Sequence, residues 1–385
     1  MLFIDVPDCR WDPYAVTRLV RGAHERNTLS IYAVVIIYSQ TPGSFSPSSI
    51  QKVSIMATAG TKPSTMRAVQ YSGYGGGGAA LKYVDIPVPS PKKDEVLIRI
   101  EAASINPADW NIQKGLLRPF VPKFPFIPVT DVAGEVVEVG PAVQELKVGD
   151  KVVSKLVFWK SGGLAEYVAA SESITVARPA GISAADAAGL PLAGFTALQA
   201  LRAIGTKFDG TGSGSNILIT AGSGGIGTYA VQLAKLGNHN VTATCGARNL
   251  EVVANIGADE VLDYKTPEGA ALKNSSGKKY DYIVNITSDG KWSAFKPALN
   301  FPGRVVDIAS NFWNFVASIL TFFSKKKLSI MIASMEKEDL RFLLDLMKEG
   351  KLKTVVDSRH PFEKVADAWE KSMSGHATGK VIVEM

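Results

Sequence analysis

The sequence predicts an α/β protein with two domains, one rich in short strands and one built on a parallel sheet. The chain has 385 residues, which is long for a single hydrophobic core. Between residues 66 and 139, short β-branched runs are separated by glycines and prolines, which argues against long helices there. From about Asp186, alanine-rich helical segments alternate with short apolar strands, the pattern typical of a parallel sheet.

The composition is that of an ordinary globular protein, with 46% hydrophobic and 20% charged residues. The net charge of +6 comes from 42 basic and 36 acidic residues. This mild excess fits anionic ligands such as phosphates, or an acidic membrane surface, and does not indicate dedicated nucleic-acid binding. The two cysteines, Cys9 and Cys245, make no disulfide framework, so we expect a reducing compartment.

The first 65 residues differ from the rest, and we expect residues 1–65 to lie outside the fold as an extension. Their apolar stretch 31–38 is about half the length that spans a bilayer. A polar, serine-rich linker follows, and Met56 is a candidate for the true start. The alternative is an atypical targeting extension, since its acidic residues do not fit an ordinary transit peptide.

The expected elements follow in chain order. The β-rich part has strands at 66–71, 95–100 and 134–139. The second part has strands at 216–220, 241–245, 282–285 and 304–308. Two helices, about 337–349 and 362–373, and a strand at 380–384 complete the chain.

A glycine-rich turn follows the apolar strand that begins at Ile217 and leads into a helix with apolar residues at Ala230, Val231 and Ala234. In this strand–turn–helix context the G-x-G-x-x-G pattern predicts dinucleotide binding. Gly222 would make the tight turn, Gly224 would let the backbone approach a pyrophosphate, and Gly227 would let helix and strand pack closely. The helix N-terminus would attract the phosphates. The predicted cofactor-binding residues of the turn are Gly222, Ser223, Gly224, Gly225, Ile226 and Gly227. The alternative is a glycine-rich turn of an unrelated doubly wound sheet.

Several further motifs make the chain similar to one family. They are Asn106-Pro107-Ala108-Asp109, Asp131-Val132-Ala133-Gly134, the run 162–167 (GGLAEY), the run 190–197 (LPLAGFTA) and the turn itself. From Met66 to Met385 the sequence resembles the zinc-independent quinone-oxidoreductase branch of the medium-chain dehydrogenase/reductase superfamily. Three more phrases, at 244–249, 263–269 and 375–380, resemble the plant members of the chloroplast envelope.

The resemblance implies a domain organisation and a location. Residues 66–187 and 326–385 would form a β-rich, GroES-like catalytic domain. Residues 188–325 would form an inserted Rossmann domain, and the cleft between the two would hold the nicotinamide. The implied location is the chloroplast envelope, peripherally, whereas composition alone also allows the cytoplasm.

The predicted cofactor is NADPH. NAD-preferring folds usually place an acidic residue after the second strand to bind the ribose 2′-hydroxyl. Here Val241–Cys245 is followed by no acid, and Arg248 can bind a 2′-phosphate with charge-assisted hydrogen bonds. Tyr264 matches a tyrosine that contacts this phosphate in similar quinone reductases. The alternative is that Arg248 is a solvated residue at a helix start.

No zinc site is expected. The zinc alcohol dehydrogenases of the superfamily use a cysteine and a Gly-His-Glu segment at the catalytic ion. Here the corresponding segments are 106–109 and 130–132, and the four histidines lie far from both. Without thiolate or imidazole ligands there is no tetrahedral site, so reversible oxidation of simple alcohols is disfavoured.

A zinc-free site suits small hydrophobic substrates that accept hydride without strong carbonyl activation: quinones and α,β-unsaturated carbonyls such as enones, alkenals and ketols. Asn106 is the first candidate to orient the nicotinamide ribose or substrate, although it could merely shape a turn. Thr196 matches a threonine near the nicotinamide in similar enzymes. The alternative is that Thr196 is a helix residue at the junction between the two domains, without a catalytic role. Many relatives carry Lys or Tyr where this chain has Asn111, which leaves the proton donor open. Asp109 is expected to brace the turn.

The expected partners leave one rival function open. Aromatic segments at 156–160 and 311–323 fit a pocket lining, core or dimer contacts, and we expect a homo-oligomer. The second segment, which runs into Lys325, Lys326 and Lys327, could instead touch a membrane surface. Besides an alcohol dehydrogenase, the rival is a protein that binds NADPH without turnover, which Asn111 keeps under consideration.

Overall fold

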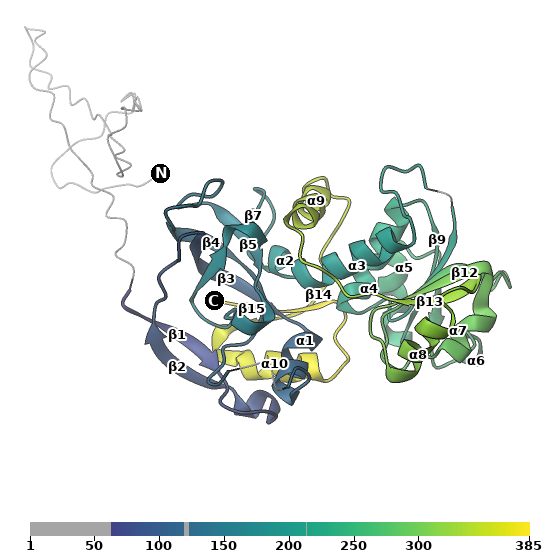
Figure 1. The fold of residues 1–385 in the computed structure, drawn as a ribbon, viewed down its shortest axis with the longest axis horizontal. Coiled ribbons are helices and arrows are strands. Elements are labelled where there is room, and N and C mark those ends of the chain that lie inside the picture. The colour runs from purple at the N-terminus through teal and green to yellow at the C-terminus, as the bar shows by residue number, and fades with distance from the viewer. Residues whose placement is uncertain (1–62, 119–122, 213) are drawn as a thin grey trace, which may run out of the picture. The chain divides into compact units, whose positions relative to one another are not determined.

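The structure is a computed structural model that describes residues 63–118, 123–212 and 214–385. The expectations for the N-terminal extension therefore concern residues that, up to position 62, lie outside the described part of the chain. Residues 64–385 form one compact unit. As the sequence predicts, this unit combines a largely antiparallel β structure with a parallel sheet and helices (Figure 1).

The β-rich part contains a seven-stranded sheet whose strands come from both ends of the unit. Its order is β14-β15-β3-β4-β5-β7, and β6 pairs with β3. The strands are β3 (Glu95–Ile105), β4 (Asp131–Val139), β5 (Lys151–Lys155), β6 (Tyr167–Ser171), β7 (Thr175–Ala177), β14 (Val356–Pro361) and β15 (Lys380–Glu384). A separate hairpin joins β1 (Thr65–Gln70) to β2 (Lys82–Pro87). The antiparallel pairing of β15 with β3 brings the C-terminus beside this part, as Figure 1 shows.

The second sheet has six parallel strands in the order β10-β9-β8-β11-β12-β13. They are β8 (Asn216–Ile219), β9 (Asn240–Cys245), β10 (Glu260–Asp263), β11 (Tyr280–Asn285), β12 (Leu299–Asp307) and β13 (Lys326–Ile330). Counted from β8, this is the order 3-2-1-4-5-6 of the doubly wound dinucleotide-binding fold. The topology reverses between β8 and β11, and ligands bind beyond the carboxyl ends of the strands at such a point.

Helices surround both sheets. In chain order they are α1 (Pro107–Lys114), α2 (Ala184–Ala188), α3 (Pro191–Ala203), α4 (Gly225–Leu236), α5 (Leu250–Asn255), α6 (Pro267–Ala270), α7 (Trp292–Ala298), α8 (Phe312–Leu320), α9 (Lys337–Lys348) and α10 (Val365–Met373). The expected helices near 337–349 and 362–373 are confirmed as α9 and α10. No helix in the described ranges is long and apolar enough to cross a membrane.

Strand alternation explains how the parallel sheet is covered on both faces. Ile217 and Ile219 of β8 pack into the core that α3 and α4 share, while Leu218 packs with Phe295 of α7 on the opposite face. Successive side chains of a strand point to opposite faces, so a short run of apolar residues supplies both cores.

One domain boundary differs from its expectation. We placed residues 326–385 in the catalytic domain, but Lys326–Ile330 is β13, which pairs in parallel with β12. The parallel sheet therefore ends after β13, not at residue 325. Lysines are common on edge strands, where they oppose unwanted pairing, so this strand lacks the apolar run of a buried one.

Candidate functional site

The glycine-rich turn lies at the carboxyl end of β8, next to the point where the strand order reverses. Gly224 is the N-cap of α4, a helix of 12 residues. The first N–H groups of such a helix have no partner within it and bind anions well. A β-carbon added at Gly224 would meet only the Ala221 oxygen, at 3.4 Å, so the space above this residue is open. That space is where a phosphate could approach the backbone.

The other two glycines of the motif have packing roles. A β-carbon at Gly227 would lie 2.1 Å from the Ala221 oxygen, so only glycine allows α4 to pack this closely on the turn. The role expected of Gly222 needs correction, because Ala221, not Gly222, takes the left-handed conformation, with φ of 50°. Gly222 is needed because a β-carbon there would lie 2.8 Å from that of Ala243 on β9.

The C-terminal segment packs directly on this turn. The Gly379 N–H donates to the backbone carbonyl oxygen of Ser223 at 2.8 Å. The Ser223 hydroxyl accepts from Asn249 Nδ2 at 3.0 Å, and Asn249 Oδ1 accepts from the Thr378 hydroxyl at 2.9 Å. Residues from two other parts of the sequence, Asn249 and the segment 378–379, therefore hold the turn in place.

Arg248 and Tyr264 both lie near the carboxyl end of β9, which Gly246 follows. Arg248 lies in the short turn 247–249, and its Nη2 donates to the His376 oxygen at 2.5 Å. Tyr264 is half exposed, and its ring lies 3.6 Å from where a β-carbon of Gly246 would be. Among the residues of this turn no acidic side chain occurs. An exposed guanidinium and a half-exposed phenol near the same strand end suit a phosphate monoester.

Asn106 is the centre of a buried polar network. It lies at the N-cap of α1, directly after β3, and Pro107 occupies the first helical position, which proline favours. Its Nδ2 donates to Asp131 Oδ2 at 2.9 Å and to the Ser104 oxygen at 3.1 Å. Its Oδ1 accepts a hydrogen bond from Lys380 Nζ. Asn106 is 2% exposed, so its amide is an internal connector between the acid and the lysine.

Lys380 links this network to the glycine-rich turn. It is the first residue of β15 and is 2% exposed. Its Cδ lies 3.1 Å from where a β-carbon of Gly225 would be, and its Nζ lies 3.9 Å from the same point. The side chain therefore passes the N-terminus of α4 and ends on Asn106. Burial lowers the pKa of the Lys380 ammonium.

Two more buried ionisable groups lie close to the network. Asp109 accepts from the Asn106 N–H at 2.7 Å, which confirms that it braces this turn. Burial raises the pKa of Asp109 to about 7, the Asn106 hydrogen bond opposes this, and the charge of Asp131 adds to it. Burial also lowers the pKa of Lys155, whose ammonium donates to the Leu156 oxygen at 3.0 Å and lies 4.1 Å from the Phe158 ring centre. Two acids and two lysines thus share one low-dielectric region.

The other predicted catalytic residues are less directly connected. Thr196 is buried in α3, and its hydroxyl donates to the Leu192 oxygen at 2.7 Å. The Leu192 N–H in turn donates to Asp131 Oδ2 at 3.1 Å, so Thr196 lies one turn from the network. Asn111 is half buried on α1, and the hydrogen bonds described around Asn106 do not include it.

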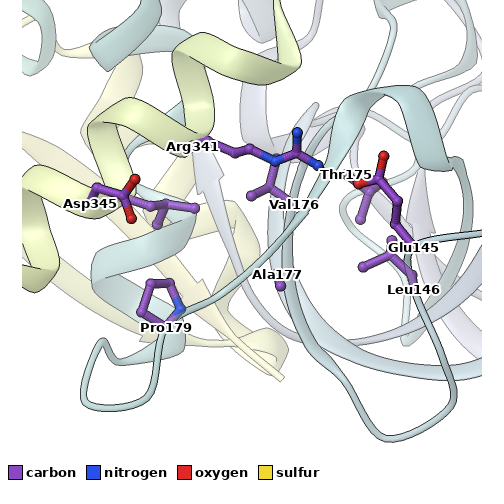
Figure 2. Close-up of a pocket in the computed structure, with 9 residues that line it drawn as sticks. Glu145, Leu146, Thr175, Val176, Ala177, Pro179, Arg341 and Asp345 are labelled. Carbon is purple, nitrogen blue, oxygen red and sulfur yellow. Dashed lines mark hydrogen bonds and ion pairs between the residues drawn. The ribbon is translucent and has the colours of Figure 1, made fainter.

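Two cavities lie elsewhere. One of about 220 Å³ lies where α9 meets β7. Figure 2 shows its lining, with Arg341 extending from α9 toward Glu145, with which it forms an ion pair. The other, of about 670 Å³, lies at the amino ends of β12 and β13 and includes Arg304 and Lys325. Neither includes Asn106 or the glycine-rich turn.

Among the described residues no group of three or more His, Cys, Asp and Glu side chains is arranged to hold a metal ion. The sequence interpretation did not single out Lys380 or Lys155. Lys380 is the last residue of the segment 375–380, which resembles the plant relatives, and nothing else in the sequence points to it. Lys155 lies in a short strand-like segment and has no further sequence feature that indicates a function. Their importance follows from burial next to Asp131, which no local pattern reveals.

Two family profiles match the chain. The alcohol dehydrogenase GroES-like domain matches residues 92–180, and the zinc-binding dehydrogenase profile matches residues 256–383. The chloroplast envelope quinone oxidoreductase homolog of Arabidopsis thaliana is 57% identical over 324 residues, which are 83% of this chain and 98% of that protein.

Two further similarities are more distant. The chloroplastic NADPH-dependent alkenal/one oxidoreductase of Arabidopsis thaliana is 36% identical over 343 residues, covering 83% of this chain and 80% of that protein. Among solved structures, the quinone oxidoreductase from Coxiella burnetii superposes with a TM-score of 0.74 at 27% identity, covering 83% of this chain and 99% of the other. These matches support both the GroES-like domain and the dinucleotide-binding sheet expected from the sequence.

Proposed function

Because the chain belongs to the medium-chain dehydrogenase/reductase family, we propose that it is an NADPH-dependent reductase of α,β-unsaturated carbonyls or quinones that works without zinc. That the protein is an oxidoreductase follows from relatives named as quinone and alkenal/one oxidoreductases. Relatives named as NADPH- or NAD(P)H-dependent also support a nicotinamide cofactor. The proposal concerns NADPH itself, the conjugated substrate and the absence of zinc.

The glycine-rich turn fits a dinucleotide. Its open space lies above Gly224, at the N-terminus of a 12-residue helix, and the ammonium of Lys380 lies close by. These features favour a pyrophosphate. Arg248 follows β9, the strand next to β8, and Tyr264 follows β10, one strand further out. The end of the second strand is where the fold binds the ribose 2′ position. The preference for NADPH over NADH rests on them and on the lack of an acidic residue in the turn 247–249 that follows β9.

The network around Asn106 supplies the groups that act on the substrate. Bound NADPH would supply a hydride. When a conjugated carbonyl accepts it, negative charge develops on the oxygen, and donors in a water-poor site stabilise that charge. We assign this role to the ammonium of Lys380, which Asn106 positions and Asp131 supports through the Asn106 amide. Because burial lowers the pKa of Lys380, its ammonium releases a proton more readily than that of an ordinary lysine, so we assign it the supply of the proton as well.

Thr196 and Asn111 have lesser roles in this proposal. Thr196 supports the helix turn at Leu192, whose N–H binds Asp131, and so it helps to position the network. Asn111 carries no titratable proton and is assigned no proton-transfer role. The absence of Lys or Tyr at that position therefore leaves Lys380 as the acid proposed for this chain.

The single observation that carries the proposal is the position of Lys380. Its side chain contacts the N-terminus of α4, where the cofactor phosphates would bind, and its ammonium contacts Asn106 of the catalytic part. One residue thus connects the cofactor-binding turn to the proposed catalytic groups.

The test measures oxidation of NADPH and NADH with a small enone, a long-chain ketol, a quinone and a simple alcohol–ketone pair. We expect turnover with NADPH and at least one conjugated substrate, with none for the alcohol pair. Bound NADPH without turnover on any substrate would favour the non-catalytic rival. Metal analysis and treatment with a chelator test the proposal that the enzyme works without zinc. Stoichiometric zinc in the protein, together with loss of activity on chelation, would overturn it.

The names of the relatives support a chloroplast location for this protein. Within the chloroplast we propose the envelope. Fractionation of chloroplasts into envelope, stroma and thylakoids, followed by detection of the native protein, tests this, and recovery in the stroma alone would contradict it.

A further inference from the structure

Lys155 is a buried lysine to which the proposed function gives no role. It is the last residue of β5 and is 1% exposed. Its ammonium donates to the Leu156 oxygen at 3.0 Å and lies 4.1 Å from the centre of the Phe158 ring. In the described part of the chain, neither Lys155 nor Lys380 forms an ion pair with a carboxylate. Buried charges without a direct counter-ion are costly, and such groups gather at functional sites.

The register of the sheet sets Lys155 directly opposite Asp131, because β5 pairs with β4 there. Residues that face each other across an antiparallel pair have Cβ atoms about 4.5–5.5 Å apart and lie on the same face of the sheet. On the other side of β4, Ser104 of β3 is opposite Asp131. Asn106 follows two positions later, and its Nδ2 donates to Asp131 Oδ2 at 2.9 Å. Asp131 therefore has Lys155 on one neighbouring strand and Asn106 just past the end of the other.

The carboxylate of Asp131 is held in place from two sides. Its Oδ2 accepts from Asn106 Nδ2 and also from the Leu192 N–H at 3.1 Å. The side chain is fully buried, so its charge acts through a low-dielectric interior. The amide of Asn106 links it to Lys380, because Asn106 Oδ1 accepts from the lysine. An ammonium has three donors and this hydrogen bond uses one of them, so the others can reach a substrate oxygen.

Charges of both signs act on Lys380. Burial has the largest effect and lowers its pKa, the charges of Asp131 and Asp109 raise it, and the charge of Lys155 lowers it. The same two acids favour the charged form of Lys155, whose pKa burial lowers. Partly buried titratable groups on the elements packed against β15 have partners of their own. They are Glu95 with Lys160, Glu101 with Arg178, Asp186 with Ser183, Tyr229 with Thr354, Lys235 with Asp259, Asp357 with Lys371, and His360 with Ser358.

We propose that Lys155 is a positioning residue for the proposed reduction: its charge, held opposite Asp131, weakens the hold of that carboxylate on the Lys380 proton. The inference rests on the proposed function, in which Lys380 supplies the proton. In that step a Lys380 N–H bond breaks, and the proton passes to the enolate that hydride transfer leaves. The neutral amine then takes a proton from water.

The surroundings of Lys155 favour a charge over a packing role. The face of the Phe158 ring attracts a cation, and Asp131 lies opposite. An apolar side chain would fill the end of β5 at least as well, since replacing buried charges by apolar groups of similar volume is often neutral or stabilising. The charge of Lys155 is therefore the property that needs a function, and the nearest proton donor of the proposed reaction is Lys380.

The experiment titrates the lysines of the full chain by NMR, with lysine labelled with carbon-13 at Cε, and measures kcat over the same pH range. Lys380→Met and Lys155→Met identify the two signals by their loss. A unit charge about 10 Å away, at an effective dielectric constant of about 20, changes a pKa by about 1. Lys155→Met should therefore raise the pKa of Lys380 by about 1. It should also lower kcat at pH 7 by up to about tenfold, because a weaker acid gives up its proton less readily.

Three further variants separate charge from packing. Asp131→Asn keeps an oxygen for both hydrogen bonds but removes the negative charge, so it should lower the pKa of Lys380. Lys155→Arg keeps the positive charge and should leave the pKa of Lys380 near its original value. The matched control is Lys151→Met, which removes a lysine from the other end of β5, about 13 Å away and beyond a Debye length. It should change neither the titration of Lys380 nor kcat.

Several results would overturn the proposal. One is a Lys155 signal that shows a neutral amine at pH 7 in the unaltered chain, which needs no comparison of activities. Another is an unchanged or lowered pKa of Lys380 in Lys155→Met, or in Lys155→Gln if the methionine variant does not fold. Loss of kcat with an unchanged titration of Lys380 would likewise contradict it, because a packing role predicts that result.

Failure of the proposed function gives a different observation. In that case the pKa of Lys380 rises in Lys155→Met as expected, but the pH dependence of kcat does not follow it. Lys380 would then not supply the proton, and the role of Lys155 in the reaction would fall with it. The effect of Lys155 on the Lys380 titration would still stand, so the two failures are distinguishable.

Discussion

The glycine-rich turn allows its structural and ligand-binding roles to be separated by two substitutions. In Gly227→Ala the new methyl would lie 2.1 Å from the Ala221 oxygen and 2.8 Å from the Gly222 Cα. Both are backbone atoms, so α4 must move. Overpacking of this kind costs about 2–3 kcal/mol, or about 5 °C in Tm for a chain of this size. In Gly224→Ala the methyl meets one atom at 3.4 Å, and φ is −79°, which alanine adopts readily.

We therefore expect Gly224→Ala to change Tm by less than about 2 °C. It should nevertheless raise the Kd for NADPH at least tenfold, about 1.4 kcal/mol, because the methyl occupies the space through which a phosphate approaches the backbone. Gly227→Ala should weaken both stability and binding. Gly73→Ala is the control, since nothing lies within 4 Å of its β-carbon. Calorimetry and NADPH titration measure the effects. Normal NADPH affinity in Gly224→Ala would refute the assignment of this turn to the pyrophosphate, and unchanged stability of Gly227→Ala would refute the packing argument.

Three further predictions concern the proposed site. Arg248→Glu should raise the KM for NADPH at least tenfold and leave the KM for NADH unchanged, because it replaces the residue proposed to bind the 2′-phosphate by one that repels it. Steady-state kinetics with both cofactors measure this effect. An unchanged KM for NADPH would contradict the assignment. Lys380→Met should lower kcat strongly, whereas Lys380→Arg should keep part of the original kcat, since arginine keeps the positive charge. An equal loss of kcat in the two variants would show that lysine is required only for packing. The pKa of Asp109 is about 7 in the folded protein and near 4 in the unfolded chain. Between pH 4 and pH 7 the folded protein therefore binds more protons at Asp109 than the unfolded chain does. As a result, the contribution of Asp109 to the free energy of unfolding falls as the pH rises from 4 to 7. Urea unfolding at several pH values measures this effect. Between pH 4 and pH 7 the free energy of unfolding should fall less for Asp109→Asn than for the unaltered chain. If the two proteins show the same pH dependence, the pKa of Asp109 is not raised by folding.

Much of the fold could be predicted because its signals are local. The strand at 216–220, the glycines after it and the helix that follows occupy a continuous stretch, and β8, the turn and α4 lie there. The terminal strand expected at 380–384 is present with the same bounds. β13 was missed because an edge strand rich in lysine lacks the apolar run of a buried strand, and only its pairing with β12 identifies it.

By itself, the sequence determined the class of fold, the dinucleotide-binding turn and the family, because each depends on residues that are neighbours along the chain. The tertiary structure decided which polar residues act together. Lys380 and Asn106 are 274 positions apart, and they meet because β15 pairs with β3. Gly379, the residue before β15, in turn donates to the backbone oxygen of Ser223 in the glycine-rich turn. Burial then perturbs the acid–base properties of the lysines and of Asp109, and burial is a property of the packed molecule that a local pattern cannot contain.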